Sequence, residues 1–292
     1  MGTPVWFAYI IKKTFPYRHQ VARLSKFPPF AKLFTKTIFN GDDIVYLPKD
    51  RVVIQQTIDQ PGSTVLPSAV VDHFIEIASY HWVMNDCICR EGSNCQDHPH
   101  DLGCLFLGEA ALSINPKMGR LVSKEEAHAH MRRSRELGLV NTIGRDRIDS
   151  IWMGASPFGK LMTICSCCSC CCLWRVLPDL DRENRSKVYR LPGVEISVDV
   201  ERCAGCGRCT RDACFINAIQ MVDGKAQISA ECRGCGRCVE VCPHNAIRLT
   251  ISDPDYADRQ IAHLSKLIDL QASEQPRQIQ RTHQRAEEQP GD

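Results

Sequence analysis

Residues 203–209 read C-A-G-C-G-R-C, and residues 232–238 read C-R-G-C-G-R-C. A fourth cysteine follows each unit, Cys214 after the first and Cys242 after the second, and each of these precedes an Asn-Ala-Ile sequence. The second unit repeats the first within about 50 residues, which indicates one structural unit used twice. This repeat decides the fold of the C-terminal part of the chain.

The spacing of the cysteines within each unit has a physical explanation. A cube of iron and sulfide needs four thiolates in a tetrahedral arrangement, and three cysteines separated by two residues can supply three of them from one tight loop. Backbone N–H groups can approach the sulfurs because glycines occupy intervening positions, namely Gly205, Gly207, Gly234 and Gly236. Zinc sites also use C-x₂-C pairs, but they do not need a third cysteine at the same spacing in both copies. We therefore interpret both units as ligands of [4Fe–4S] clusters.

Residues 194–252 resemble the bacterial two-cluster ferredoxin family. The second unit fits the family pattern fully, with Pro243 after its last cysteine. The first unit departs from it, because four residues instead of three precede Cys214 and Phe215 replaces the proline. The extra residue is expected to loop outward. The resemblance implies that each cluster takes its fourth ligand from the other unit. The two ligand sets are then Cys203, Cys206, Cys209 and Cys242, and Cys232, Cys235, Cys238 and Cys214.

The remaining sequence of this segment predicts short strands. Residues 194–200 and 247–251 alternate between apolar and polar side chains, and Asp223-Gly224 is a strong hairpin-turn signal within 219–228. We expect a sandwich of β-hairpins and short helices with a pseudo-twofold repeat.

Ten more cysteines precede this segment, and all are predicted to bind metal. They are Cys87, Cys89, Cys95 and Cys104, and then Cys165, Cys167, Cys168, Cys170, Cys171 and Cys172. Ten thiolates suffice for one or two further iron–sulfur clusters. The preferred arrangement places the first four around one centre, with exchange of ligands between this centre and the 165–172 loop. Zinc remains an alternative for these ten, because the three-cysteine run is absent here.

Most of the chain resembles a group of uncharacterised multi-cluster ferredoxin-like proteins of anaerobic bacteria and archaea. The shared features are C-I-C-R at 87–90, G-C-L-F-L-G-E-A at 103–110, S-K-E-E-A at 123–127, the multi-cysteine loop and the two-cluster segment. The resemblance implies additional clusters in residues 87–172 and does not identify a reaction.

The chain as a whole is predicted to be α+β, with an α-rich, cysteine-containing domain before the ferredoxin segment. We divide it into a basic, aromatic-rich arm (1–41), a helical iron–sulfur domain (42–177), a linker (178–193), the two-cluster domain (194–252) and a helical or disordered tail (253–292). Helices are expected over 67–84 and from Ser123 to about Gly138, where Ser123 and Glu126 form a capping box. The stretch 139–151 looks extended, with Gly144 at a turn. His81 in the first helix is expected to be a core residue.

Residues 1–41 carry seven basic residues, no acidic residue and many aromatic ones. This composition suits either an arm lying on an anionic membrane surface or an arm packed over the protein's own core. A net charge of +2 gives no sign of nucleic-acid binding. No run approaches the roughly 18 apolar residues of a transmembrane helix. The many thiols and the lack of a signal peptide point to the reducing cytoplasm, with peripheral contact to the inner membrane face as an option.

The favoured function is relay of single electrons between a donor and a partner redox enzyme, which requires no acid–base residue. The alternative is a reductase with a substrate-reactive cluster or thiol site in residues 87–172, which the surplus cysteines favour. Arg90 either hydrogen-bonds a cluster or forms a surface salt bridge. The histidines near these cysteines, namely His98, His100, His128 and His130, are expected to be solvated rather than metal-bound. There is no dinucleotide fingerprint or phosphate-binding glycine loop.

Overall fold

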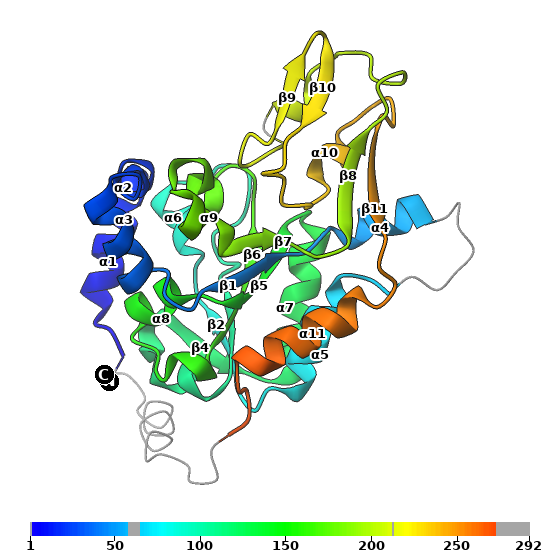
Figure 1. Ribbon diagram of the computed structural model, residues 1–292. Coiled ribbons are helices and arrows are strands. Elements are labelled where there is room, and N and C mark those ends of the chain that lie inside the picture. The colour runs from blue at the N-terminus through cyan, green and yellow to red at the C-terminus, as the bar shows by residue number, and fades with distance from the viewer. Residues whose placement is uncertain (1, 58–64, 212, 273–292) are drawn as a thin grey trace.

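The computed structural model describes residues 2–57, 65–211 and 213–272, and its centre is a seven-stranded sheet (Figure 1). The strand order is β4-β2-β3-β6-β5-β1-β7. Neighbouring strands are antiparallel except for β1 and β7, which are parallel. The strands are β1 (Asp43–Tyr46), β2 (His81–Met84), β3 (Leu105–Leu107), β4 (Gly119–Val122), β5 (Val140–Arg145), β6 (Met162–Cys167) and β7 (Val188–Arg190).

The two faces of this sheet are covered by different elements. One face packs against α4 (Asp50–Thr57), α5 (Ser68–Ile77), α7 (Lys124–Glu136) and α11 (Tyr256–Leu267), and fully buried Phe74, Met131 and Leu264 lie in this core. The other face packs against α6 (Ile88–Gly92), α8 (Arg147–Met153) and the 3₁₀ helix η5 (Leu173–Asp179). Since side chains alternate along a strand, Cys165 and Cys167 of β6 share this second face. The sheet therefore presents thiols on one side and an aliphatic core on the other.

Residues 42–177 were predicted to be helical, and they contain helices α4 to α8, but six of the seven strands also lie there and the sequence did not predict this sheet. The helix expected over 67–84 ends at Ile77, since the chain becomes extended at Ala78 and then forms β2. His81 lies in that strand, and its ring contacts the Ile75 carbonyl oxygen at 2.7 Å, which agrees with a core role.

Helix α7, which was expected from Ser123 to about Gly138, has the predicted ends. Ser123 caps α7 in a capping box with Glu126, and Gly138 has a φ of +69° just beyond the helix. The prediction that residues 139–151 are extended is only partly right. Residues 140–145 are extended as β5, but Asp146 caps helix α8, so residues 147–151 are helical. Gly144 lies inside β5 rather than at a turn, and a side chain there would collide with the Asp43 carbonyl oxygen of β1.

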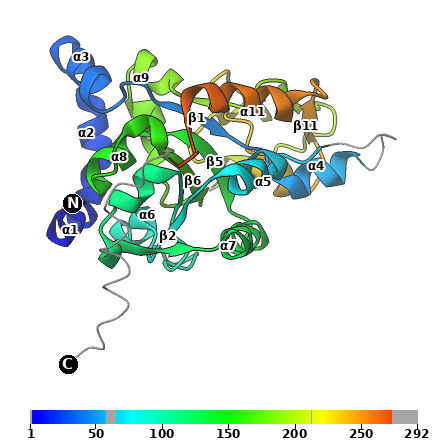
Figure 2. The same cartoon turned by 90° about the horizontal axis from the view of Figure 1, so that it is seen from below.

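The segments expected to be an arm and a linker are both structured. The arm forms α1 (Val5–Thr14), the 3₁₀ helix η1 (Phe15–Tyr17), α2 (Arg18–Leu24) and α3 (Pro28–Thr37), and it packs on α6, α8 and η5. Figure 2 shows these helices on the opposite side of the molecule from α4. Residues 178–193 contain α9 (Arg182–Ser186) and β7, whose Val188 is fully buried against the sheet. The expected tail contains α11, and its last residues, 273–292, lie outside the described residues.

Residues 194–251 form the module at the top of Figure 1. Strand β8 (Val194–Val198) pairs with β11 (Ile247–Ile251), and β9 (Ile219–Val222) pairs with β10 (Lys225–Ile228). The hairpin turns at Asp223-Gly224, as the sequence predicts, and both residues have positive φ. A short 3₁₀ helix, η6 (Arg208–Thr210), follows the first cysteine loop, and α10 (Arg237–Glu240) follows the second. In the described part of the chain, no helix has the length and apolar character needed to cross a membrane.

Candidate metal centres

The eight cysteines of the module line two small cavities. One is lined by Cys203, Cys206, Cys209 and Cys242, and the other by Cys214, Cys232, Cys235 and Cys238. We call them cavity I and cavity II. Each has a volume of about 20 Å³ and combines three cysteines of one repeat with the fourth of the other. The structure thus brings together the two sets of four that the ferredoxin resemblance implies.

Backbone N–H groups point at the sulfurs of both cavities. The Ala246 N–H donates to Cys242 Sγ at 3.3 Å, and the Ala218 N–H donates to Cys214 Sγ at 3.2 Å, so the repeated Asn-Ala-Ile sequence has the same role twice. In cavity I, hydrogen bonding by the Ala226 N–H lowers the pKa of Cys203. In cavity II, burial raises the pKa of Cys232 to about 11. Backbone N–H groups that donate to sulfur, such as those of Ala246, Ala218 and Ala226, stabilise thiolates and tune the potential of a bound cluster.

The first repeat departs from the ferredoxin pattern between Cys209 and Cys214, and residue 212 lies outside the described residues. The outward loop expected there stays a prediction. Cys214 still lines cavity II. Phe215, which stands where the family has proline, stacks on Tyr46 of β1 with ring centroids 4.8 Å apart. The substitution therefore joins the module to the central sheet, a role that sequence reasoning did not foresee.

Four of the ten upstream cysteines form a compact group. The Sγ atoms of Cys95, Cys168, Cys170 and Cys171 all lie within 4.8 Å of one another, and we call this group the tetrad. The Cys171 N–H donates to Cys168 Sγ at 3.3 Å. In the arrangement preferred from the sequence, Cys95 shared a centre with the other three cysteines of its block and ligands were exchanged with the 165–172 loop. The structure instead groups Cys95 with three cysteines of that loop, which agrees with the mixing of the two blocks but not with the four-cysteine centre. The chain after β6 folds back in a turn, which places three of its thiols against Cys95.

The other six upstream cysteines line one larger cavity of about 140 Å³, which we call the thiol chamber: Cys87, Cys89, Cys104, Cys165, Cys167 and Cys172. The rest of its wall is mostly apolar and includes Trp152, Trp174 and, from the arm, Phe15. Cys104 Sγ and Cys165 Sγ lie 3.3 Å apart. A hydrogen bond from Cys89 lowers the pKa of Cys87 to about 6, which favours the thiolate that metals bind.

Arg90 is fully buried at the wall of the thiol chamber. Its guanidinium donates to the backbone carbonyl oxygens of Ser166, at 2.9 Å, and Leu102, while its Nε has no partner among the described residues. Burial alone lowers the pKa of Arg90, but the thiolates of Cys87 and its neighbours outweigh burial and raise it. The surface salt bridge considered from the sequence is therefore wrong. A buried cation without a carboxylate fits a site that holds negative charge.

Two side chains connect the thiol chamber to cavity II. The Tyr46 hydroxyl lies 3.5 Å from Cys172 Sγ, and the ring of Tyr46 stacks on Phe215, which lines cavity II. Arg237 of α10 is buried, donates to the Cys167 carbonyl oxygen and lies 5.8 Å from the Phe215 ring centroid. No sequence pattern pointed to Tyr46, and Arg237 was visible only as one of the two arginines of the second cysteine unit.

Three of the four histidines singled out in the sequence contact protein groups, namely His100, His128 and His130. His100 Nδ1 is 2.8 Å from a Glu91 carboxylate oxygen, His128 Nε2 is 2.7 Å from Glu76, and His130 Nε2 is 2.8 Å from the Gly103 carbonyl oxygen. The tetrad contains only cysteines. None of the 18 cysteines, all of which lie in the described residues, forms a disulfide bond.

The cavities and their cysteines define a protein with a ferredoxin-type iron–sulfur domain. Residues 227–248 match the family model of the 4Fe-4S binding domain, and this segment includes the second cysteine unit and Cys242. Neither a curated protein nor a solved structure matches the chain. The family match and the gathered cysteines indicate iron–sulfur electron transfer.

Proposed function

We propose that the chain relays single electrons between a donor and a partner redox enzyme, through two [4Fe–4S] clusters in cavities I and II and further iron–sulfur centres upstream. One observation carries this proposal, namely the contacts from Cys172 through Tyr46 and Phe215 to cavity II. Buried side chains at van der Waals distance give electrons a short path that excludes water. The cluster supplies the redox chemistry, and the chain's residues hold it, shield it and set its potential.

The described residues support an order for the centres along this path. Cys168 of the tetrad also lines the thiol chamber, which contacts cavity II through Tyr46 and Arg237. Cavities I and II share one apolar cluster that contains Cys209 and Cys238. Cys206 of cavity I is exposed, whereas most thiols of the other sites are buried or half-buried. We therefore place the exchange of electrons with a partner at cavity I.

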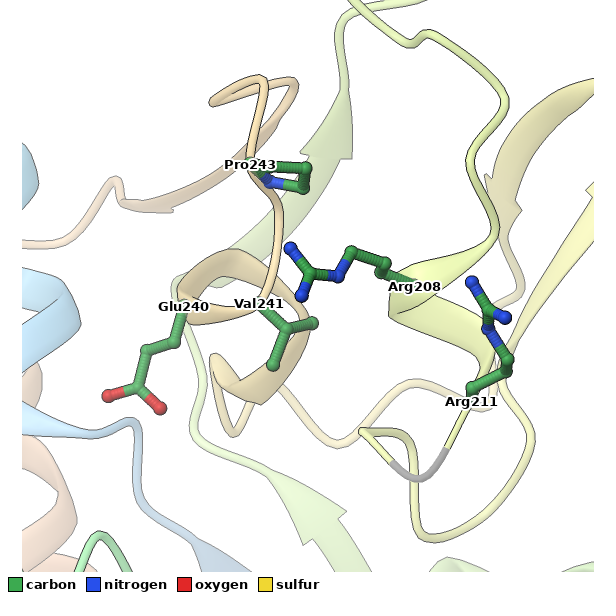
Figure 3. Close-up of a pocket in the computed structure, with 5 residues that line it drawn as sticks. All are labelled: Arg208, Arg211, Glu240, Val241 and Pro243. Carbon is green, nitrogen blue, oxygen red and sulfur yellow. The ribbon is translucent and has the colours of Figure 1, made fainter.

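A surface hollow beside cavity I suits a partner with negative charge. It is lined by Arg208, Arg211, Glu240, Val241 and Pro243 (Figure 3). Figure 3 shows the Arg208 side chain reaching across the hollow towards Pro243, while Glu240 points to the far side, where it pairs with Lys49. Among the described residues, neither arginine has a carboxylate partner. We propose that an acidic surface of the redox partner docks here.

Small one-electron acceptors of opposite charge test this docking site. Re-oxidation of the reduced protein by an anionic cobalt(III) complex at low salt should slow about ten-fold in the R208E/R211E variant, because steering by charge is lost. Re-oxidation by a cationic cobalt(III) complex should not slow. R132E/R133E, at two exposed positions of α7, makes the same change of charge away from the hollow and is the matched control. Failure of the wild-type protein to take up and release electrons singly would overturn the whole relay proposal.

The arm supports a second contact, with a membrane surface. Its exposed side chains include Trp6, Phe27, Phe30 and Leu33, with exposed Lys32 and Lys36 nearby. Aromatic and basic side chains together favour the interface of an anionic bilayer. We propose peripheral contact with the inner face of the cytoplasmic membrane, which also fits the reducing compartment that free thiols need. W6E/F30E should abolish sedimentation with anionic vesicles, and V200E, at an exposed module position, should not.

The surplus of thiols in the chamber favours one other function. Its six cysteines exceed the four ligands of one cubane, which would suit a reductase whose substrate reacts at a free thiol or an open iron. Substrate-dependent re-oxidation without a partner protein would distinguish this activity from electron relay.

A further inference from the structure

The occupant of the thiol chamber can be inferred by comparison within the molecule. Each cavity of the module has four thiols and about 20 Å³ of space, whereas the chamber has about 140 Å³ and seven thiols in its wall. One of the seven, Cys168, belongs to the tetrad, which is complete with four cysteines and takes none of the other six. A single cubane in the chamber would leave two thiols unused and much of the space unfilled.

Three arginines lie at or near the chamber, whose wall also contains the buried carboxyls of Asp146 and Asp149. Burial raises the pKa of both carboxyls, which favours their neutral form. Arg90 and Arg237 are buried, and Arg18 is half-buried and interacts electrostatically with Cys89 and Cys172. Each has one guanidinium nitrogen with no partner among the described residues: Nε of Arg18, Nε of Arg90 and one terminal nitrogen of Arg237. Unpartnered buried N–H groups are costly and normally have an acceptor. Arg90 lines the chamber, and Arg18 and Arg237 interact electrostatically with its cysteines, so the three groups favour an occupant with negative charge and sulfur acceptors.

The ligand count identifies the size of that occupant. One cubane binds four terminal thiolates, so two separate cubanes would need eight. Two cubanes joined by a bridging sulfide each lose one terminal position to the bridge, and the pair then needs six. We propose that the thiol chamber holds a single eight-iron centre of this kind, ligated by all six cysteines. The inference rests on the proposed iron–sulfur character of the chain but not on its electron relay.

The proposed centre gives each of the six thiols a definite role. The six lie at four places in the chain: Cys87 just before α6 and Cys89 within it, Cys104 just before β3, Cys165 and Cys167 in β6, and Cys172 just before η5. Removal of any one should disturb the whole centre, since every cysteine is a ligand. With a single cubane, two of the six would be dispensable.

Iron counting on anaerobically purified full-length variants tests the proposal. C104S/C165S should lose about eight irons per chain, and the matched control C170S/C171S, in the tetrad, should lose about four. In each case the iron content of the variant is subtracted from that of the wild-type protein. The result therefore does not depend on how many clusters the module carries. A loss of about four irons from the chamber variant, or of zinc, would overturn the inference.

A second measurement covers the case in which the chamber variant does not fold. Mössbauer spectra of wild-type protein grown on ⁵⁷Fe should assign about twenty irons per chain, eight in the module, four in the tetrad and eight in the chamber. About sixteen irons in four cubanes would contradict the eight-iron centre while leaving the electron relay intact. Absence of iron from the module would instead contradict the proposed function itself.

Discussion

The cysteines of the module lie close together in the sequence, whereas those of the thiol chamber come from separate elements of the fold. In the module, three of the four thiols of each cavity come from one loop of seven residues, and the fourth comes from a nearby turn. In the chamber, the six thiols come from α6, β6, η5 and the chain before β3, which only the complete sheet brings together. The first kind of site is encoded by local spacing, and the second by tertiary structure.

The two regions also differ in what holds them together. The buried cluster at the centre of the module contains Cys203, Cys209 and Cys238 and only a few aliphatic side chains. The chamber lies against a sheet with a large aliphatic core on its other face, where Phe74 and Leu264 are fully buried. We therefore expect the module to depend on bound metal to fold, while the sheet has an aliphatic core of its own.

Removal of iron should produce the largest difference between the module and the central sheet, because only the module is expected to unfold. We expect a chelator under reducing, anaerobic conditions to unfold the module, because structural metal sites contribute about 10 kcal/mol to folding. The central sheet should persist. Hydrogen–deuterium exchange read by mass spectrometry checks this, with amides of β9 and β10 losing protection and those of β5 and β6 keeping it. Equal loss of protection in both regions would show that the comparison is wrong.

Replacement of the buried cation at the chamber should have the next largest effect. Arg90→Met leaves the negative charge of the chamber without its counter-ion, which should cost about 3–5 kcal/mol of folding stability. Iron should be lost from the chamber but not from the module. Arg90→Lys keeps the charge without the planar donors and should retain part of the iron. Arg133→Met removes an exposed ion pair with Asp101 and should change the unfolding midpoint little.

The module and the chamber also differ in how far the sequence predicts them. The module's strands, its hairpin turn and the grouping of its eight cysteines follow from short-range patterns, so residues such as Asp223 and Cys242 could be placed. Of the central sheet, only the extended stretch that contains β5 was predicted, because most of the other strands are short and β3 is buried on both faces. Leu105–Leu107 shows no alternation of apolar and polar residues, and the cysteines of β6 conceal its strand pattern.

The upstream ligand groups could not be predicted for a related reason. Cys95 lies eight residues or fewer from Cys87 and Cys89 in the sequence, yet it joins the tetrad, since the turn after β6 packs against it. Arg90 follows Cys89 directly, and only the fold shows that it is buried. Tyr46 meets Cys172 across more than a hundred residues. Contacts of this range depend on the register of the whole sheet.

Within the module, two glycines of the same loop allow a finer test. Gly205 and Gly207 have φ of +71° and +67°, so alanine is strained at either position. A side chain at Gly205 would also collide with the Gly224 carbonyl oxygen, whereas at Gly207 the nearest atom is Thr210 Oγ1 at 3.8 Å. Gly207→Ala should cost about 1 kcal/mol, and Gly205→Ala about 1–2 kcal/mol more, with faster loss of iron from cavity I. Equal stability of the two variants would contradict the packing described here.

The smallest expected effect concerns the sheet rather than the metal sites. Asp42 is buried before β1, and its Oδ1 accepts a hydrogen bond from the Arg147 N–H at 2.7 Å. Burial, together with the nearby Asp149 carboxylate, raises the pKa of Asp42 from 3.8 to about 7. Between these two values the folded chain holds a proton that the unfolded chain has released, so this contribution to stability is complete below about pH 4 and is lost as the pH rises through 7.

Asp42→Asn keeps the acceptor for Arg147 and removes the titration. We expect the free energy of unfolding to fall less between pH 6 and pH 8 in this variant than in wild type, by on the order of 1 kcal/mol. Urea unfolding of the anaerobic protein at the two pH values measures the difference, and Asp258→Asn, on the exposed side of α11, controls for loss of one acidic residue. An unchanged or steeper pH dependence in Asp42→Asn would mean that the Asp42 carboxyl is already ionised in the folded chain. The stability of the sheet would then be independent of this proton, and the aliphatic core alone would distinguish it from the metal-dependent module.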